Sequence, residues 1–505
     1  MTPKRKTLFW RLIFKAVPLG IALSVASLAF ASSSDSALAD AVEKRDADTI
    51  GALLSPNADI DAAQVDGMTA LHWAAYHDDT ELAKRLLSMG ASPSLENNYG
   101  VTPLYLACVN GNAEVVSALL RSGADPNTAI RGGETALMTA ARTGEMGTVK
   151  ALLDAGSEVN QTERKGQTAL MWASAEGHID VVKALLDAGA DETVALERSG
   201  YTAFFFAIRE GHRDLVHFFL DYGADINAPM DTKRPAGKLP KKGTTPLILA
   251  VENGHYDLAV ELLDRGADPN DMSSGYSVLH TLTWIRKPDI GESASGDPPP
   301  RGTGKRNTDQ FIRDLVARGA DVNARLEKGR RAGNGHVSVI GATPFFLAAD
   351  RADLPYMKLL IELGADPFIP NEDGTTALMV AAGIGSRAPE EEAGSEAECL
   401  AAVKYLVSLG ADVNTVDANG ETAMHGAALK NIPSMVHYLN EVGADIRIWN
   451  KKNRDGWTPL LIAEGYRPGN FKPSFETVDA ITEVMLANNV ALPTGPKPKH
   501  TNYAN

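Results

Sequence analysis

Apolar residues recur along this chain in short clusters with helical spacing, and glycine and polar residues separate the clusters at regular intervals. In the stretch 100–132, Val115, Val116 and Leu119 fall on one face of a helix. Gly123 ends that helix, as glycine does at the left-handed residue after a helix. Because the arrangement returns down the chain, it predicts many copies of a pair of short helices.

The same stretch also marks the first helix of the pair. Thr102 is placed to accept an orphan backbone N–H, and Pro103 follows at the first helical position, where a missing N–H costs nothing. Gly111 ends this helix, and residues 124–127 later turn the chain back with side chains that bond their own backbone. Each unit is therefore predicted to be helix, turn, helix and hairpin-like loop.

The units can be followed by the pattern Gly-x-Thr-(Ala/Pro)-Leu, which usually returns every 33 residues. A period in this range indicates a stacked solenoid, because two short helices cannot bury both of their apolar faces alone. The pattern begins at Gly67, Gly100, Gly133, Gly166, Gly200, Gly243, Gly275, Gly341, Gly374, Gly420 and Gly456. We therefore expect an all-α solenoid of about 11 repeats with an N-terminal cap.

Departures from the pattern divide the chain into segments. Residues 36–66 keep the apolar helix faces but lack the Thr-Ala-Leu box, as expected for the capping unit that a solenoid needs. The expected segments are a signal peptide at 1–31, an N-terminal capping repeat at 32–66, regular repeats at 67–227, repeats with long basic and Pro-rich insertions at 228–340, repeats with an acidic insertion at 341–455, a C-terminal capping repeat at 456–492 and a disordered tail at 493–505.

Four insertions interrupt the array. Insertions 228–242 and 324–340 are basic and lengthen hairpin-like loops, so we expect them to project from the same edge as two fingers. Insertion 286–309 is Pro-rich and insertion 385–397 is acidic, and both fall between the two helices of a unit. The fingers favour an anionic partner, either an acidic protein face or an envelope polymer. The alternative is two solvated loops that happen to be basic.

Charge narrows the choice of partner. The chain has 49 Lys and Arg against 64 Asp and Glu, a formal net charge of −15. Such a surface repels phosphate backbones, which argues against nucleic acid as a general partner.

The N-terminus predicts export. Basic residues at 4–6 precede an apolar run over 16–31, which ends in the small-x-small site Ala29-Phe30-Ala31. Because the run is shorter than the ~20 residues of a spanning helix, we expect cleavage and no transmembrane segment in the mature chain. The alternative is an uncleaved anchor.

The sequence has no local signature of catalysis. Stretch 301–306 resembles a phosphate loop only faintly, because Pro299 stands where that motif has glycine and Arg306 stands where it has Ser or Thr. We expect no catalytic, cofactor-binding or metal site and a non-enzymatic protein. An enzyme with its site in the insertions at 286–340 is the less favoured alternative.

The histidines and cysteines are also expected to have structural roles. His178, His212 and His255 share one repeat position, which favours a ring bonded to a neighbouring loop over a metal ligand. Cys108 and Cys399 fall seven repeats apart, too far for a disulfide, and are expected to be small buried hydrophobes.

The repeat closely resembles the ankyrin repeat. Residues 69–75, Thr-Ala-Leu-His-Trp-Ala-Ala, nearly reproduce the family's signature box, and residues 181–186 with 189–191 match its second half. The resemblance covers roughly residues 36–492 and implies a curved solenoid that binds protein through its concave groove and hairpin tips. The layout also resembles a group of exported bacterial ankyrin proteins with long insertions in late repeats.

Candidate contacts follow from positions that vary in chemistry while their neighbours repeat. Trp73 and Trp172 are expected in the core between repeats, whereas positions three and four residues later should face the groove. The groove candidates are Tyr76, His77, Asn110, Arg142, Glu176, Arg209, Glu210 and Glu252. The hairpin-tip candidates are Tyr99, Arg131, Arg164, Lys165, Arg198, Lys233, Arg234, Lys241, Lys242, Arg330 and Arg331.

The function expected from all of this is a monomeric, exported binding scaffold for a protein partner. It would act in the periplasm or outside a bacterial cell. A secreted effector or inhibitor of another protein is the alternative.

Overall fold

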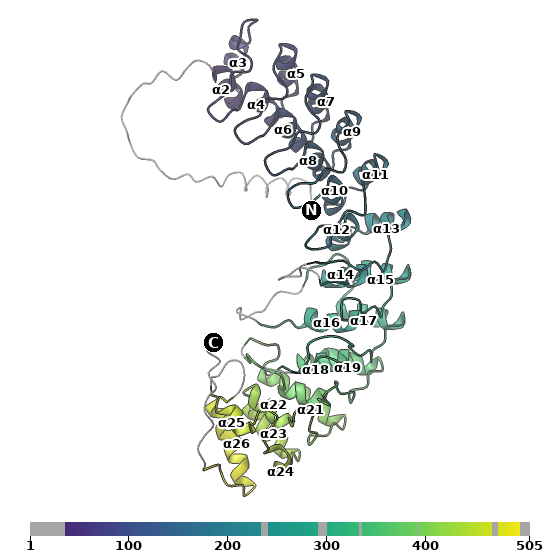
Figure 1. The fold of residues 1–505 in the computed structure, drawn as a ribbon, viewed down its shortest axis with the longest axis vertical. Coiled ribbons are helices and arrows are strands. Elements are labelled where there is room, and N and C mark those ends of the chain that lie inside the picture. The colour runs from purple at the N-terminus through teal and green to yellow at the C-terminus, as the bar shows by residue number, and fades with distance from the viewer. Residues whose placement is uncertain are drawn as a thin grey trace, which may run out of the picture.

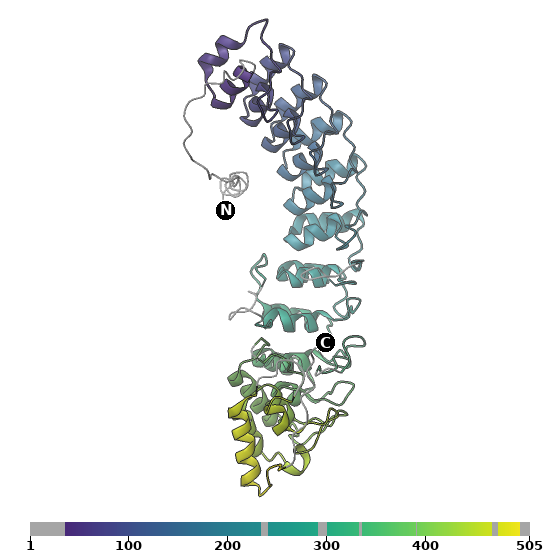
Figure 2. The same ribbon diagram turned by 60° about the vertical axis from the view of Figure 1, so that its left-hand side comes forward.

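The computed structural model describes residues 36–233, 241–290, 300–332, 336–389, 391–466 and 473–494. They form a curved stack of helix pairs, and Figure 2 shows the two ends of the described chain at opposite ends of the stack. The predicted signal peptide at 1–31, the candidate contact Arg234 and most of the tail at 493–505 lie outside the described residues.

Eleven helix pairs follow the cap, one for each predicted unit. The first helices line the concave side in Figure 1: α2 (Ala37–Lys44), α4 (Ala70–Tyr76), α6 (Pro103–Asn110), α8 (Ala136–Thr143), α10 (Ala169–Glu176), α12 (Ala203–Glu210), α14 (Pro246–Glu252), α16 (Val278–Arg286), α18 (Pro344–Asp350), α20 (Ala377–Ala382), α22 (Ala423–Leu429) and α25 (Pro459–Ala463). The second helices are α3 (Ala47–Leu53), α5 (Thr80–Ser88), α7 (Ala113–Arg121), α9 (Met146–Asp154), α11 (Ile179–Asp187), α13 (Arg213–Tyr222), α15 (Tyr256–Asp264), α17 (Thr308–Ala317), α19 (Leu354–Glu362), α21 (Glu396–Ser408), α23 (Pro433–Glu441) and α26 (Phe475–Ala487).

Two local features complete the backbone. The short helix α24 (Ile446–Trp449) occupies the loop after the tenth pair. No strand forms among the described residues, where an isolated bridge joins Ala129 to Thr135. The all-α repeat solenoid predicted from the sequence is confirmed.

The helix ends lie where the sequence signals place them. Thr102 Oγ1 accepts the N–H of Tyr105 at 3.2 Å, and Pro103 occupies the first turn of α6. Gly111 then adopts φ 71°, the left-handed conformation that costs glycine little. The capping threonine, or Ser277 in the seventh repeat, therefore gives a common origin for numbering positions in every repeat.

One apolar core runs the length of the stack. It extends from Leu38 in the cap to Met485 in α26 and includes Leu71, Leu104 and Leu137, each exposed by no more than 1%. Every repeat therefore buries its helices against its neighbours, as a one-dimensional solenoid requires.

Both cysteines belong to this core, and neither takes part in a disulfide. Cys108 and Cys399 are buried, as predicted, and burial raises the pKa of both thiols. No helix among the described residues combines the length and the apolar content that crossing a bilayer requires.

A ladder of polar side chains joins consecutive repeats. The Nε2–H groups of His178, His212 and His255 donate to main-chain carbonyls at the end of the preceding first helix, over 3.0, 2.9 and 2.8 Å. Asn110 does the same in an earlier repeat, donating to Ala75 O at 2.8 Å. The structural role predicted for the periodic histidines is confirmed.

A second histidine set locks the helix starts. His72, His280 and His425 place Nδ1 within 3.0 Å of the capping hydroxyl, while Nε2 lies within 3.2 Å of a carbonyl oxygen close to the start of the next repeat. Those carbonyls belong to Val101, Ala342 and Lys451. Burial lowers the pKa of His280 and His425 to about 4, because the charged ring is poorly solvated there.

Insertion 286–309 brackets repeats six to eight. The N–H of Thr303 donates to His255 Nδ1 at 2.9 Å, which fastens the insertion to the sixth repeat. Arg286 reaches the eighth repeat through Asp353, with Nε–Oδ2 at 3.0 Å, and also pairs with Asp309 at 2.6 Å. The described residues of this insertion therefore tie into the sixth and eighth repeats.

The predicted projection of insertion 324–340 is wrong for its last part. Residues 336–340 lie across α20 of the ninth repeat, because Asn371 Nδ2 donates to Ser338 O at 2.8 Å on one side of that helix. On the other side, Arg387 bonds His336 Nε2 at 2.7 Å. Polar partners at both ends and buried side chains in between hold this segment against the concave face.

His280 provides a test by pH of the second histidine set. A folded-state pKa of about 4, below the usual 6.5, means that the unfolded chain binds the extra proton between these values, so stability falls as pH drops through this window. His280→Gln should remove roughly 2 kcal/mol of the loss that the wild type suffers between pH 7 and pH 5. Urea unfolding at both pH values measures it, and equal losses in the two proteins would contradict the assignment.

The insertion bracket predicts a contrast between two arginines. Arg286→Met leaves Asp353 buried without its cation and should cost about 3–5 kcal/mol of unfolding free energy. Arg313→Met removes an exposed pair with Glu362 on the convex side and should cost about 0–1 kcal/mol. Thermal unfolding of both variants separates the two cases, and similar midpoints would show that the bracket adds nothing.

Candidate functional site

The concave face changes from open to closed along the stack. We define the groove position of a repeat as the seventh residue after its capping Thr or Ser. The side chain at this position is 55% exposed at Tyr76 and 45% exposed at Val109, and Leu429 is only 4% exposed. The groove-position residues are Tyr76, Val109, Arg142, Ala175, Arg209, Glu252, Trp284, Asp350, Gly383, Leu429 and Gly465. This position is exposed in the first two repeats, half-buried from the third to the eighth and buried in the last three, so the accessible concave surface lies before the ninth repeat.

The first repeat presents an aromatic cluster on this face. Trp73 packs edge-on against Tyr76 with ring centroids 5.5 Å apart, and His77 stacks on Trp73 at 5.7 Å. Trp73 Nε1 donates to Gln64 Oε1 at 2.7 Å, which fixes the indole. Trp73 is half-buried in the groove wall and is not enclosed between repeats, so the predicted core position is only partly correct.

A recess of about 450 Å³ opens in the concave face between the fourth and fifth repeats. It brings together three of the predicted groove residues, Glu176, Arg209 and Glu210, with the rings of Trp172 and Phe206. Arg209 and Glu210 form an ion pair at 2.7 Å, and no hydrogen bond or ion pair joins Glu176 to another described residue. The recess therefore combines aromatic walls with an unneutralised carboxylate.

Arginines lie over the aromatic walls of this recess. The Arg142 guanidinium is 5.0 Å from the Trp172 ring, and that of Arg209 is 4.8 Å from Phe206 and 5.3 Å from Tyr201. Burial raises the pKa of the Tyr201 hydroxyl to about 12, although Arg209 acts in the opposite direction. The first helices thus carry cation–aromatic layers that a partner would meet first.

Two groove candidates serve the scaffold as well as the surface. Asn110 donates to the carbonyls of Ala75 and Tyr76, and His77 Nε2 donates to Glu43 O at 3.0 Å. Substitution of either residue would therefore disturb the stacking of repeats.

The hairpin-tip candidates fall into two groups. The exposed group without a described ion pair consists of Tyr99, Arg131, Arg164, Lys165, Arg198, Lys233 and Arg330. In the other group, Lys242 pairs with Asp231 at 3.0 Å, Arg331 pairs with Glu372 at 3.5 Å, and Lys241 lies against two aromatic rings. The basic fingers are therefore partly neutralised by their own chain.

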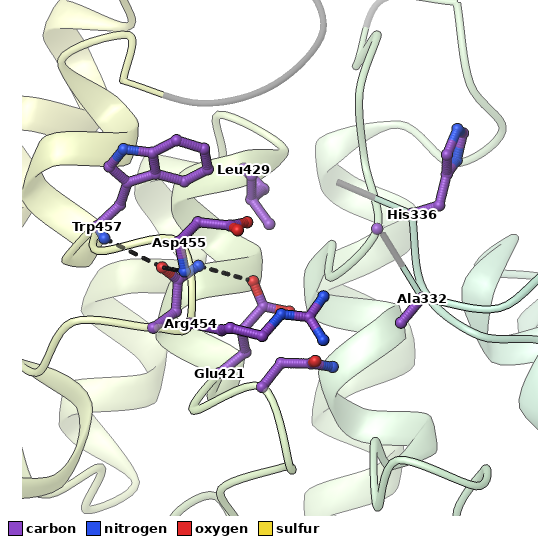
Figure 3. Close-up of a pocket in the computed structure, with 10 residues that line it drawn as sticks. Ala332, His336, Glu421, Leu429, Arg454, Asp455 and Trp457 are labelled. Carbon is purple, nitrogen blue, oxygen red and sulfur yellow. Dashed lines mark hydrogen bonds between the residues drawn. The ribbon is translucent and has the colours of Figure 1, made fainter. Parts of the chain in front are cut away.

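A second recess, which was not predicted from the sequence, lies between residues 332 and 457, toward the closed end of the stack (Figure 3). Ala332 and His336 of the insertion lie on one side, and Arg454 and Trp457 lie on the other. Glu421 lies between them and accepts a hydrogen bond from Asn453 Nδ2 at 3.0 Å. Burial, with Asp417 nearby, raises the pKa of Glu421 to about 7. No sequence pattern could place the insertion here, because its path depends on contacts with distant repeats.

The part of the chain that the structure describes contains no candidate metal site. Within those ranges, no group of three His, Cys, Asp or Glu side chains gathers as a metal site needs. What the concave face offers instead is an extended surface of rings and charges, which suits recognition of another macromolecule.

The same array occurs in proteins of varied architecture. The chain is 29% identical over 178 residues to potassium channel AKT1 of Arabidopsis thaliana, 34% over 174 residues to neurogenic locus notch homolog protein 1 of Xenopus tropicalis, and 31% over 161 residues to an ankyrin repeat and KH domain-containing protein of Caenorhabditis briggsae. These alignments cover 32%, 30% and 28% of this chain but only 19%, 6% and 6% of the relatives. The chain therefore spans only a small part of the length of these relatives.

The sequence model of the family described as ankyrin repeats (3 copies) matches residues 38–130, 123–195, 194–273 and 393–472, which is more than half of the chain. Those matches coincide with the helix pairs, the threonine caps and the histidine ladder described above. The chain therefore belongs to the ankyrin-repeat family.

Proposed function

We propose that this chain is an exported, non-enzymatic scaffold that holds a protein partner on the concave face of its first seven repeats. Membership of the ankyrin-repeat family supports a protein–protein interaction scaffold. The observation that carries the placement is the gradient of exposure at the groove position, from 55% at Tyr76 to 4% at Leu429. A partner can reach side chains only where the chain has left them open.

The recess between the fourth and fifth repeats is the centre of the proposed surface. Trp172 supplies a large, half-buried ring at low conformational cost, and rings of this kind dominate protein interfaces once a partner buries them. Glu176 adds a carboxylate without a described partner, which favours a basic side chain opposite it. A rigid stack also loses little entropy on binding, since its apolar core already fixes the backbone.

Export is the second part of the proposal. It is supported by the basic start, the apolar run and the Ala29-Phe30-Ala31 site, together with the resemblance to exported bacterial ankyrin proteins. We expect the mature chain in the periplasm or outside the cell, acting as a monomer. Fractionation of cells that make the full chain, with an antibody against the repeats, measures this directly.

A photo-crosslinking pair tests the proposed surface. A crosslinking residue at Val109, on the open concave face, should yield a discrete protein adduct in envelope fractions. The same residue at Asp187, which is exposed at the end of α11 on the convex side, should yield none. Trp172→Ala should lower the Val109 adduct about tenfold or more, as removal of a central aromatic contact does.

A matched charge change serves as the control for that experiment. Glu176→Lys should reduce the adduct, whereas Asp187→Lys makes the same change on the convex side and should not. Equal adducts from both faces, or insensitivity to Trp172→Ala, would show that the partner binds elsewhere.

A further inference from the structure

Two aromatic rings form a corner on the concave face of the seventh repeat. The ring centroids of Tyr276 and Trp284 are 5.0 Å apart and the ring planes meet at 84°. Tyr276 directly precedes the capping Ser277, and Trp284 occupies the groove position, so both rings belong to the face that the first seven repeats leave open. Both side chains are half-buried and keep access to solvent.

The corner already holds a cation from this chain. The Nζ atom of Lys241 lies 3.8 Å from the centroid of the Tyr276 ring and 4.6 Å from that of Trp284. An ammonium in this position is attracted by the negative faces of both rings. Lys241 is nevertheless exposed as a residue and lies on a loop outside any helix, so its side chain can leave without unfolding a repeat.

A carboxylate acts on the same ammonium from beyond ion-pairing distance. Glu252 occupies the groove position of the sixth repeat and is half-buried, and no hydrogen bond or ion pair joins its side chain to another described residue. Burial raises the pKa of Glu252 to about 7, while Lys241 acts in the opposite direction. The ammonium therefore has rings on two sides and an otherwise unpartnered acid nearby.

We propose that Tyr276, Trp284 and Glu252 form a binding site for the ammonium group of a partner's lysine side chain, and that Lys241 occupies this site while the partner is absent. We call these three residues the ammonium box. That the lysine comes from a protein rests on the proposed function, whereas the affinity of the box for an ammonium does not.

The neighbouring layer shows why this cation is the exchangeable one. Arg209 also covers two rings, Tyr201 and Phe206, but it belongs to α12 and forms an ion pair with Glu210. The planar guanidinium of Arg209 lies over two rings tilted by 39°, whereas rings meeting at 84° enclose a compact ammonium from two directions. The box in the seventh repeat therefore suits a lysine ammonium, and the side chain that occupies it can move away.

The test uses the full chain and two probes with the same four-carbon side chain. N-acetyl-lysine methylamide carries the terminal ammonium, and N-acetyl-norleucine methylamide carries a hydrogen in its place. Titration of protein with ¹⁵N-labelled tryptophan follows the six indole N–H signals, and Trp284→Phe identifies the signal of Trp284. In Lys241→Ala, the lysine probe should shift that signal with an affinity roughly tenfold above the wild type, because the internal competitor is gone.

Lys242→Ala is the matched control. It removes the same charge from the next position, but Lys242 pairs with Asp231 and does not touch the rings, so probe affinity should stay at the wild-type value. In the Lys241→Ala background, Glu252→Gln should weaken the lysine probe while circular dichroism stays unchanged.

Three results would overturn the proposal. The first is that the lysine probe does not shift the Trp284 signal in Lys241→Ala. The second is that the norleucine probe shifts this signal as much as the lysine probe does. The third is that Lys241→Ala and Lys242→Ala raise the affinity for the lysine probe equally. None of these results depends on capture of a protein partner. Failure of the crosslinking experiment would leave the ammonium box intact, and failure of the box would leave the scaffold proposal intact.

Discussion

The bonding of each repeat to its neighbour is the constraint on which the rest of the structure depends. A single helix pair leaves an apolar face and several carbonyl oxygens without partners. The adjacent repeat covers the apolar face and donates hydrogen bonds to the carbonyl oxygens. His178 and His212 each donate to a carbonyl of the preceding repeat while the apolar core continues beneath them. Because this bonding fixes the register of the stack, groove-position side chains from successive repeats follow one another along the concave face.

The register explains how much could be predicted from sequence. Thr102 and Gly111 mark helix ends by local chemistry, so the fold follows from residues close in the chain. The same register brings Glu176, Arg209 and Glu210 into one recess. Tyr276 escaped notice because it precedes the cap and reads as a loop residue, whereas its ring packs against a residue two turns into α16.

The paths of the insertions could not be predicted from the sequence, because they depend on residues far away in the chain. The Ser338 carbonyl accepts a hydrogen bond from Asn371, and His336 is hydrogen-bonded to Arg387. Neither pairing has a sequence signature. Their effect is to divide the concave face. Where residues 336–340 lie across α20, the chain already contacts the surface that a partner would need, and the earlier repeats keep theirs open.

Cations lie over the aromatic rings of the concave face. Half-buried rings left bare would form an apolar patch prone to association, and Arg142 and Lys241 shield the rings of Trp172 and Tyr276. Exchange of Lys241 for a partner's ammonium would leave the cation–ring energy nearly unchanged, because one ammonium replaces another. Affinity must then come from contacts beside the ammonium box, such as the recess at Trp172.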